Sequence, residues 1–248
     1  MIINISVCIA TWNGQKYIKE QLDSILSQLS EYDEVVISDD SSTDKTVEII
    51  KSYNDKRIKI LENQNFKSPI FNFENALKYA DGKIIILADQ DDVWKKNKIE
   101  KIKEYMQNYD LVLSDADIID KNSSIVKESF YEINNSKSGF FKNLMKNSFL
   151  GCTMAFNQKI LEKSLPFPKD LPMHDWWIGL IGEIYGKTYF IEDKLISYRR
   201  HGGNISSAGE KSKYSIKQKI FFRFIMIKNL IQKYLANLLK ERDNWLNE

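Results

Sequence analysis

The chain has 248 residues, of which 43% are hydrophobic and 28% are charged. These proportions are typical of a globular protein with one large core, and they exclude a disordered or collagen-like chain. Thirty-six Lys and Arg residues against 34 Asp and Glu residues leave a formal net charge of +2, which does not favour a nucleic-acid-binding protein. Two cysteines, Cys8 and Cys152, are too few for a disulfide framework and fit a reducing compartment.

The first two-thirds of the chain alternate between apolar, β-branched runs and segments with helical periodicity. The run 83–88 is apolar on both faces, as in a central strand of a parallel sheet. This alternation predicts an α/β fold, with a mostly parallel central sheet and helices on both faces. Strands are expected at 3–10, 34–38, 57–61, 83–88 and 111–114, and helices at 17–29, 43–53, 70–80 and 99–106.

The pattern is less regular beyond residue 115. Residues 121–150 are polar, and only a short helix near 139–147 is expected there. The remaining expected elements are a strand at 151–156, a helix at 175–185, one or two strands at 188–199, and one or two helices from residue 214 onward.

Polar clusters follow three of the expected strands: Thr11-Trp12-Asn13, Asp39-Asp40 and Asp89-Gln90-Asp91-Asp92. Ligands of open parallel sheets bind beyond the carboxyl ends of the strands. Carboxylates crowded as in residues 89–92 raise each other's pKa unless a cation is present, and Mg²⁺ or Mn²⁺ suits oxygen ligands together with substrate phosphates. The cluster therefore predicts a metal site that binds a diphosphate. On spacing alone, Asp91 and Asp92 equally fit a cap for a helix starting near Trp94.

Three other motifs each have a structural interpretation. Asp39-Asp40 fits either a turn and helix cap, with Ser42 or Thr43 capping the next helix, or hydrogen bonding to a base or ribose. Thr11 and Asn13 are typical strand-end turn residues. Asp115-Ala116-Asp117 is expected to be mainly structural, followed by a hairpin turn at 120–122.

The motif His174-Asp175-Trp176-Trp177 opens an expected helix. The pattern by itself favours Asp175 as an N-cap, and the functional alternative is a general base whose pKa is raised by an aromatic, water-poor environment. The loop 198–204 contains two Arg residues, a His and two Gly residues, so it fits either a phosphate and metal site or a solvated basic loop.

The motifs of several other enzyme classes are absent from the sequence. No Gly-x-Gly-x-x-Gly follows the first strand, and there is no Cys/His metal spacing and no Gly-x-Ser-x-Gly turn. The segment Gly182–Thr188 has three residues between its glycines where a P-loop has four, and it follows a helix instead of a strand.

The order of motifs at residues 7–14, 37–44 and 87–94 resembles a family 2 glycosyltransferase with the GT-A fold. The later motifs at 174–177 and 198–201 resemble the branch that includes bacterial rhamnosyltransferases of cell-surface polysaccharides. The resemblance covers residues 4 to 205.

The resemblance implies inverting transfer of a sugar from a nucleoside-diphosphate donor to an acceptor hydroxyl. It implies that Asp175 is the general base, and that Asp91, Asp92 and His201 hold Mg²⁺ or Mn²⁺. The residues that it places around the nucleotide sugar are Thr11, Asn13, Asp39, Asp40, Asn72, Asp89, Gln90, Asp91, Gly151, Cys152 and Arg200.

The resemblance also implies the partners and the domain organisation. The donor is expected to be UDP- or dTDP-linked, with rhamnose by analogy, and the acceptor a glycan or a lipid-linked sugar. A GT-A domain is expected at 1–205, with a nucleotide-binding half at 1–115 and an acceptor half at 116–205, followed by a helical extension at 206–248. No nucleic-acid partner is expected.

Two positions depart from the family's pattern. Many relatives have an acidic residue before the base, where this chain has His174. Many also have a Gly-rich stretch that ends in Ala-Arg-Asn, whereas no Arg occurs between Asn63 and Asn72, and only the final Asn is kept.

The N-terminus lacks the features of a signal peptide, so a cytoplasmic location is expected. Residues 213–248 contain eight Lys or Arg residues against three Asp or Glu residues, with many apolar side chains between them. Arg223, Lys228 and Lys233 interrupt the longest apolar stretch, which argues against a membrane span. The segment fits a basic amphipathic helix on the inner face of the cell membrane, a helix packed on the domain, or a homodimer interface.

Three alternatives from other classes remain open on the sequence. A signalling receiver domain also binds Mg²⁺ at strand ends, but it needs an acidic pair where Thr11-Trp12-Asn13 stands, and about half this length. A non-catalytic sugar-nucleotide-binding module and a nucleotidyltransferase are the other two.

Overall fold

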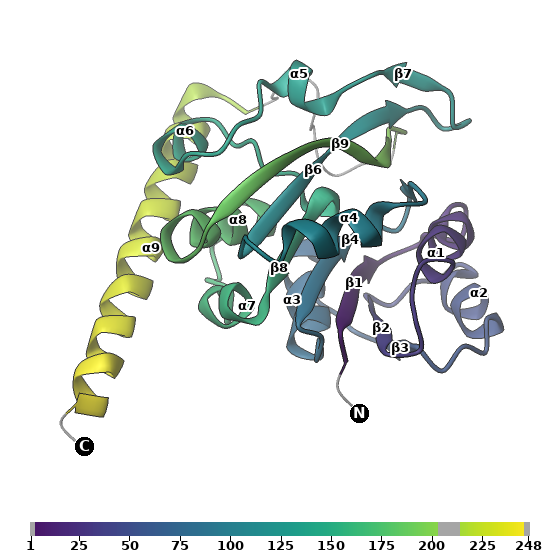
Figure 1. The fold of residues 1–248 in the computed structure, drawn as a ribbon, viewed down its shortest axis with the longest axis horizontal. Helices are drawn as coiled ribbons and strands as arrows, with labels where there is room; N and C mark the ends of the chain where they lie inside the picture. Colours follow the sequence, from purple (N-terminus) through teal and green to yellow (C-terminus); the bar gives the residue numbers. More distant parts are fainter. Residues whose placement is uncertain (1–2, 203–213, 246–248) are drawn as a thin grey trace.

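One curled sheet runs through the molecule, with helices around it and a long helix along one side (Figure 1). The computed structural model describes residues 3–202 and 214–245. The strands are β1 (Ile5–Thr11), β2 (Asp33–Asp39), β3 (Ile58–Leu61), β4 (Ile84–Ala88), β5 (Val93–Trp94), β6 (Leu111–Ile119), β7 (Ile125–Lys127), β8 (Met154–Asn157) and β9 (Thr188–Arg199). The helices are α1 (Ile18–Leu26), α2 (Thr46–Ser52), α3 (Pro69–Lys78), α4 (Lys98–Tyr105), α5 (Phe130–Asn134), α6 (Phe140–Met145), the 3-10 turn η1 (Gly151–Thr153), α7 (Gln158–Ser164), α8 (His174–Tyr185) and α9 (Ile216–Trp245).

The first half of the sheet is parallel, in the order β3-β2-β1-β4. Thr11 is paired with Asp39, and Ile9 with Ala88, so β1, β2 and β4 end at the same edge. The polar clusters that follow these strands are therefore brought to one edge of the sheet, as expected for a parallel α/β arrangement.

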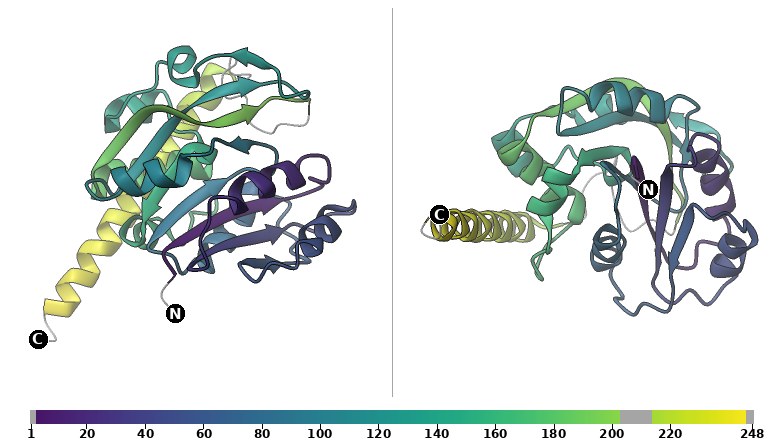
Figure 2. Two further views of the ribbon diagram at one scale, coloured as in Figure 1. Left: turned by 45° about the vertical axis from the view of Figure 1, so that its right-hand side comes forward. Right: turned by 60° about the horizontal axis from the view of Figure 1, so that its bottom comes forward.

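The second half of the sheet contains strands of both directions. β8 lies between β4 and β6 and is antiparallel to both, while β9 is parallel to β6 and antiparallel to β5. The α/β fold with a central sheet and surrounding helices is confirmed. The sheet is less parallel than expected because β8 returns after the long polar segment and fills the space between two strands that run the same way (Figure 2).

β6 is five residues longer than the sequence indicates, because it continues through Asp115-Ala116-Asp117. The Asp115 carboxylate accepts hydrogen bonds from the Ser129 hydroxyl and the Tyr131 amide, and Asp117 forms an ion pair with Lys95 (2.7 Å). These partners allow polar residues to be buried inside a strand. The structural interpretation of this motif agrees with these contacts, and the turn after Asp120 leads into the antiparallel strand β7.

Two expected helix caps are not found. α2 begins at Thr46, where the Asp44 carboxylate accepts a hydrogen bond from the Thr46 amide, so neither Ser42 nor Thr43 is the cap. α4 begins only at Lys98, with β5 before it, so Asp91 and Asp92 do not cap that helix. Asp91 and Asp92 are therefore available for a role other than helix capping.

Apolar side chains pack on both faces of the sheet. α1 packs against one face through Leu22 and Ile25, and α8 packs against the other through Trp177 and Ile181. A Cβ atom on Gly179 would lie 2.3 Å from the ring of Phe149, so only glycine allows α8 to approach this closely. α8 is thereby fixed beside the strand ends, with Asp175 in its first turn.

The C-terminal segment forms a single long helix, α9, that packs along the domain by one face. Met226 and Leu230 on that face are buried, the Asn229 amide donates to the Asp170 carboxylate, and the Lys233 ammonium donates to the Leu165 carbonyl. In the described part of the chain, no helix has the length and apolarity needed to cross a membrane. The expected boundary at residue 205 lies outside the described residues, and β6 runs across the expected boundary at 115.

Candidate active site

The carboxyl ends of β1 and β2 are joined through Thr11 and Asp39. The Thr11 hydroxyl donates to the Asp39 carboxylate at 2.8 Å, and the Ser42 amide and hydroxyl donate to the same carboxylate. Because Thr11 and Asp39 are buried and these bonds hold the turn after β2, both residues shape the edge of the sheet.

Asp40 and Asn72 hold the neighbouring chain segment. The Asp40 carboxylate accepts hydrogen bonds from the amides of Phe66 (2.6 Å) and Ser68 (3.3 Å), and so fixes the loop before α3. The Asn72 side-chain amide donates to the Thr11 carbonyl at 3.1 Å, while its Oδ1 atom is buried and has no partner among the described residues. A buried acceptor without a donor at this edge is a group that a ligand can satisfy.

Asn13 and Gln90 order the turn after β1. Asn13 has a φ of 49°, in the left-handed region, and its Oδ1 atom accepts a hydrogen bond from the Thr43 amide. The Gln90 side chain pairs with both backbone groups of Trp12, at 3.0 and 3.1 Å. A Cβ atom on Gly14 would lie 2.4 Å from Gln90 Oε1, so this glycine leaves room for the pairing.

A buried acidic cluster lies between β4 and η1. Single ligand atoms of Asp89, Asp92 and Cys152 lie within 4.8 Å of one another. The ammonium of fully buried Lys98 donates to the Cys152 carbonyl at 2.9 Å, and the charges of Asp92 and Asp89 stabilise this ammonium. Burial nevertheless lowers the pKa of Lys98 to about 8. The cluster therefore already contains a cation.

Burial changes the protonation of these groups. It raises the pKa of the Asp92 carboxyl well above its usual range, and the charges of Asp91 and Asp89 raise it further. It also raises the pKa of the Cys152 thiol. Raised pKa values and a neighbouring ammonium make this carboxyl and this thiol less favourable ligands for Mg²⁺ or Mn²⁺ than a readily ionised carboxylate.

Arg199, the last residue of β9, is almost fully buried and connects several segments. Its backbone amide donates to Asp92 Oδ1 (2.8 Å), and its guanidinium donates to the Asp91 carbonyl (2.7 Å) and to the Glu20 carboxylate (2.6 Å). The guanidinium also lies over the ring of Tyr17, 4.7 Å from its centroid. The interpretation of residues 198–204 as a solvated basic loop is therefore wrong for Arg199.

Asp91 and His201 lie side by side at the end of the acidic cluster. His201 Nε2 is 2.7 Å from Asp91 Oδ2, and the imidazole stacks on Tyr17 with 5.1 Å between ring centroids. Burial raises the pKa of Asp91, and the hydrogen bond from His201 opposes that change. A carboxylate oxygen and an imidazole nitrogen that converge in this way fit a divalent cation such as Mn²⁺.

Asp175 lies in the first turn of α8, after the N-cap residue Met173, so it is not itself the cap. Its carboxylate accepts hydrogen bonds from the amides of Trp176 (2.6 Å) and Gly151 (3.3 Å). Burial outweighs these bonds and raises the pKa of Asp175 to about 7, a value that suits a general base near neutral pH.

Acidic residues of two separate segments, the one after β4 and the first turn of α8, approach one another. Burial raises the pKa of Asp89 to about 7, and the nearby charges of Asp91 and Asp175 contribute to that rise. The predicted residues Asp89, Asp91, Asp92, Gly151, Cys152, Asp175 and His201 are thus neighbours, linked by the contacts above. Thr11, Asn13, Asp39, Asp40, Asn72 and Gln90 form the adjoining group at the ends of β1 and β2. The Arg200 amide donates to the Ile119 carbonyl.

His174 has unusual surroundings for a polar residue. It is 6% exposed and stacks on Phe73, with 4.4 Å between ring centroids. Neither ring nitrogen has a hydrogen-bond partner among the described residues, and burial lowers the pKa of His174 to about 3. A Cβ atom on Gly151 would lie 3.3 Å from His174 Nε2, so the imidazole lies next to Gly151, whose amide donates to the Asp175 carboxylate.

Three residues of the site were not identified from the sequence. Lys98 directly precedes the expected helix at 99–106, Arg199 belongs to the segment 198–204, and Tyr17 is an apolar position of the expected helix at 17–29. A signal for Arg199 lies in the largely apolar run Leu195–Tyr198 just before it, since a charged residue that continues a buried strand requires a partner.

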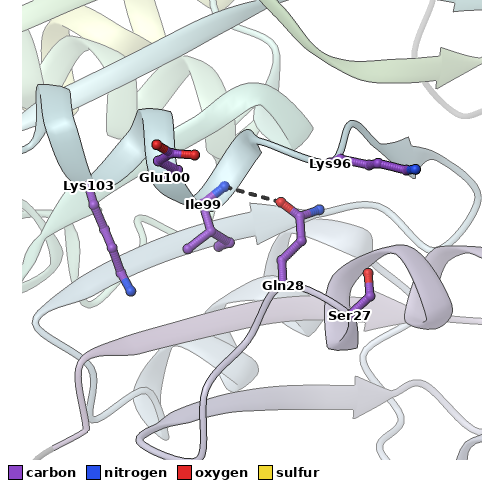
Figure 3. A pocket seen from close by; sticks show the side chains of 6 residues that line it. All are labelled: Ser27, Gln28, Lys96, Ile99, Glu100 and Lys103. Atoms are coloured by element: carbon purple, nitrogen blue, oxygen red, sulfur yellow. Dashed lines mark hydrogen bonds between the residues drawn. The ribbon is translucent and has the colours of Figure 1, made fainter.

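Two surface pockets lie elsewhere. One is lined by Tyr105, Tyr189, Glu192 and Asp193. The other lies beside α4 and is lined by Ser27, Gln28, Lys96, Ile99, Glu100 and Lys103 (Figure 3). Gln28 Oε1 accepts the Ile99 amide there, which joins the end of α1 to α4. Neither pocket includes any residue of the acidic cluster, so the strand ends remain the candidate site.

Comparisons with known proteins agree with this geometry. The sequence model of glycosyl transferase family 2 matches residues 6–165. The chain is 26% identical to the putative teichuronic acid biosynthesis glycosyltransferase TuaG of Bacillus subtilis, over 96% of this chain and 97% of that protein. It is 27% identical to the dTDP-rhamnosyl transferase RfbG of Shigella flexneri, over 96% of this chain and 86% of that protein.

Solved structures share the fold. TarS 1–349 of S. aureus, in complex with UDP-GlcNAc, superimposes with a TM-score of 0.69 at 22% identity, and the match covers 92% of this chain and 67% of that one. The fold and the strand-end site define a GT-A enzyme that transfers a sugar from a nucleotide sugar. The chain belongs to glycosyl transferase family 2, so the predicted family, fold and enzyme class are confirmed, and the signalling-receiver alternative is wrong.

Proposed function

We propose that this glycosyltransferase moves a sugar, with inversion, from a UDP- or dTDP-linked donor to a hydroxyl of a glycan or lipid-linked acceptor. The proposed setting is the synthesis of a bacterial surface polysaccharide in the cytoplasm. The observation that carries the proposal is the buried Asp175 carboxyl, whose pKa of about 7 arises beside the acidic residues at the end of β4.

Asp175 is proposed to act as the general base. Its carboxylate accepts the proton of the acceptor hydroxyl while that oxygen attacks the donor sugar from the face opposite the diphosphate. One base is enough for a single displacement, and inversion requires no protein nucleophile. The amides of Gly151 and Trp176 hold the carboxylate in place, which supports a fixed geometry for proton transfer.

Asp91 and His201 are proposed to hold Mg²⁺ or Mn²⁺. When bound, such a cation neutralises the charge that develops on the leaving diphosphate. Asp92 was also expected to be a ligand, but its contacts with the Arg199 amide and the nearby Cys152 favour a role in positioning Asp91. A relative in fold, the mannosyltransferase PcManGT of Pyrobaculum calidifontis, has been solved with GDP-Man and Mn²⁺.

The ends of β1 and β2 are proposed to bind the nucleoside. The Asn72 Oδ1 atom, which has no hydrogen-bond partner among the described residues, supports this assignment, because a base or ribose can donate a hydrogen bond to it. Thr11, Asn13, Asp39, Asp40 and Gln90 are proposed to shape this part of the site. Asp89, Gly151 and Cys152 are proposed to lie near the ribose and donor sugar, and Arg200 near the phosphates.

The two halves of the sheet are proposed to bind different substrates. The parallel strands β1 to β4 would serve the nucleotide, and the second half of the sheet, with α8, would serve the acceptor. Because β6 runs across residue 115, both halves contribute strands to one sheet.

A thermal-shift screen tests the donor and the metal together. UDP, dTDP and GDP, and UDP-glucose, UDP-GlcNAc and dTDP-rhamnose, would each be added with and without Mn²⁺. A ligand at about 100 times its Kd stabilises the folded protein by about 2.7 kcal/mol. We expect a UDP or dTDP compound to raise the melting temperature, and Mn²⁺ to increase that shift. No shift with any nucleotide would contradict the proposal.

A chemical assay distinguishes the remaining alternatives. A glycosyltransferase releases a nucleoside diphosphate, whereas a nucleotidyltransferase releases pyrophosphate. Among curated relatives, WfgD and WfaP of Escherichia coli are named as UDP-Glc glucosyltransferases that use a GlcNAc-diphosphoundecaprenol acceptor. An acceptor of that chemical class, a sugar linked by diphosphate to a polyprenol, is the first to test.

A further inference from the structure

The outward face of α9 carries a continuous apolar stripe. Six apolar residues recur every three or four positions and are between 42% and 77% exposed: Ile216, Ile220, Phe224, Ile227, Ile231 and Tyr234. This spacing places them on one side of the helix. A stripe of this length is far more apolar surface than a scattering of single exposed residues.

The stripe is separate from the face that packs on the domain. Met226 and Leu230 are buried in a core cluster of the catalytic domain, and Ile225 is buried as well. Ile225 and Met226 point away from the stripe, whereas Leu230 lies at its edge, beside Ile227 and Tyr234. Figures 1 and 2 show α9 running along the outside of the molecule, with its C-terminal turns extending beyond the other elements. Packing on the domain therefore accounts for one face of α9 and leaves the other to a partner.

Basic residues border the stripe on both sides. By helical geometry, Lys217 and Lys228 lie along one border, and Lys219 and Arg223 along the other. Residues 214–240 contain no Asp or Glu. Lys228 also contacts Asp170 of the domain, and the Arg223 guanidinium donates to the carbonyls of Lys219 and Met145, which leaves its positive charge without a carboxylate in those bonds.

This charge pattern indicates what kind of partner binds the apolar stripe of α9. A second copy packed stripe to stripe would bring basic borders against basic borders, and like charges along a helix pair are destabilising. An anionic lipid surface instead offers negative headgroups to the basic borders and acyl chains to the apolar stripe. The long side chains of Lys and Arg can reach the headgroups while their methylene groups lie on the apolar surface.

We propose that the outward stripe of α9 docks this enzyme on an anionic membrane surface, with the helix lying in the plane of the interface. The proposal goes beyond the transfer reaction and does not depend on which donor is used. Docking places the catalytic domain at the surface where lipid-linked acceptors are found, while the inward face of α9 keeps the domain attached.

Vesicle flotation tests the proposal with the full chain. Vesicles of phosphatidylcholine alone would be compared with an equal mixture of phosphatidylcholine and phosphatidylglycerol. We expect the protein to float with the mixed vesicles, to bind phosphatidylcholine much less, and to lose binding as salt screens the charges. Equal binding to both vesicles, or no binding to either, would overturn the proposal.

Matched variants locate the contact on the helix. We expect Phe224→Gln/Ile231→Gln to weaken vesicle binding by at least about tenfold, since two large apolar side chains are removed from the stripe. The control Gln232→Ala/Ala236→Gln changes exposed positions off the stripe and should bind as the original chain does. Wild-type binding by the stripe variant would contradict the assignment.

Two further measurements keep the outcomes separate. Light scattering reports the oligomeric state, and a dimer that the stripe variant converts into a monomer would show that a second copy occupies the stripe instead. Melting temperature and release of nucleoside diphosphate from a soluble donor should be the same in both variants and the original chain. A loss of nucleotide binding by all of them would contradict the proposed function without bearing on the stripe.

Discussion

His201 Nε2 lies 2.7 Å from Asp91 Oδ2, although 110 positions separate the two residues in the chain. The contact forms because Arg199, two residues before His201, is anchored in the protein by bonds to the Asp92 carboxylate and the Asp91 carbonyl. The end of β9 is thereby held against the segment after β4. A buried arginine thus positions both proposed ligands of a divalent cation.

Replacing His201 should weaken metal use more than it weakens the fold. We expect His201→Ala to raise the Mn²⁺ concentration for half-maximal transfer by at least about tenfold, because one of two converging ligands is lost. Nucleoside-diphosphate release measured against Mn²⁺ concentration is the readout. Tyr17→Phe keeps the ring that stacks on His201 and serves as the control. An unchanged Mn²⁺ dependence in His201→Ala would remove His201 from the metal site.

Asp175→Asn should abolish most transfer while leaving nucleotide binding intact. Loss of a general base typically lowers the rate by about 10² to 10⁴-fold. In the original enzyme, kcat/KM should rise with pH through the Asp175 pKa of about 7 and then level off, because only the carboxylate accepts a proton. The variant should lack that rise. Transfer by Asp175→Asn at the original rate would show that another group is the base.

The same residue should link stability to pH. Burial raises the pKa of Asp175 from 3.8 to about 7, so the folded chain binds this proton more tightly than the unfolded chain. Its contribution to stability is full below pH 3.8 and is lost as the pH rises to about 7, by roughly 4 kcal/mol at most. We expect Asp175→Asn to melt at a higher temperature than the original chain at pH 8. Thermal unfolding at pH 4 should show that advantage nearly gone.

Substitution of His174 should affect stability and activity differently. Buried ring nitrogens that find no partner in residues 3–202 and 214–245 reduce stability, so His174→Phe, which keeps the stacking on Phe73, should melt at an equal or higher temperature. If the imidazole contacts the acceptor or the donor sugar, transfer should fall by at least about tenfold, with separate effects on kcat and KM of the acceptor. His174→Leu controls for the larger ring. Lower stability with full activity would mean that the imidazole is only structural.

Arg199→Lys should be destabilising although the lysine keeps the positive charge. A lysine cannot make the separate bonds of the guanidinium to Glu20, Ser123 and the Asp91 carbonyl. Because Glu20 is half exposed, the main cost is the loss of buried hydrogen bonds, about 1 to 3 kcal/mol, and chemical denaturation would measure it. Arg200→Lys, on the next residue, is the control and should cost less than about 1 kcal/mol. Equal losses in both variants would show that the buried network is not the cause.

The sequence by itself determined the first half of the sheet and the identity of the acidic residues. Hydrophobic runs such as 84–88 can only be buried as central strands, and polar residues directly after them are left at the strand ends. The order of the motifs was specific enough to identify the family, which the comparisons confirm. These features are local, so a single segment contains the information.

Only the tertiary structure decided how the segments combine. That β8 is antiparallel between β4 and β6, that Lys98 places its ammonium in the acidic cluster, and that Arg199 is buried all depend on contacts between distant residues. The sequence does not distinguish a solvated charged side chain from a buried, paired one, because burial depends on the partners that folding brings to the side chain. For the same reason, the sequence did not decide whether the C-terminal helix packs on the domain or lies on a membrane. The structure shows that one face of α9 is buried on the domain and that another face exposes apolar side chains.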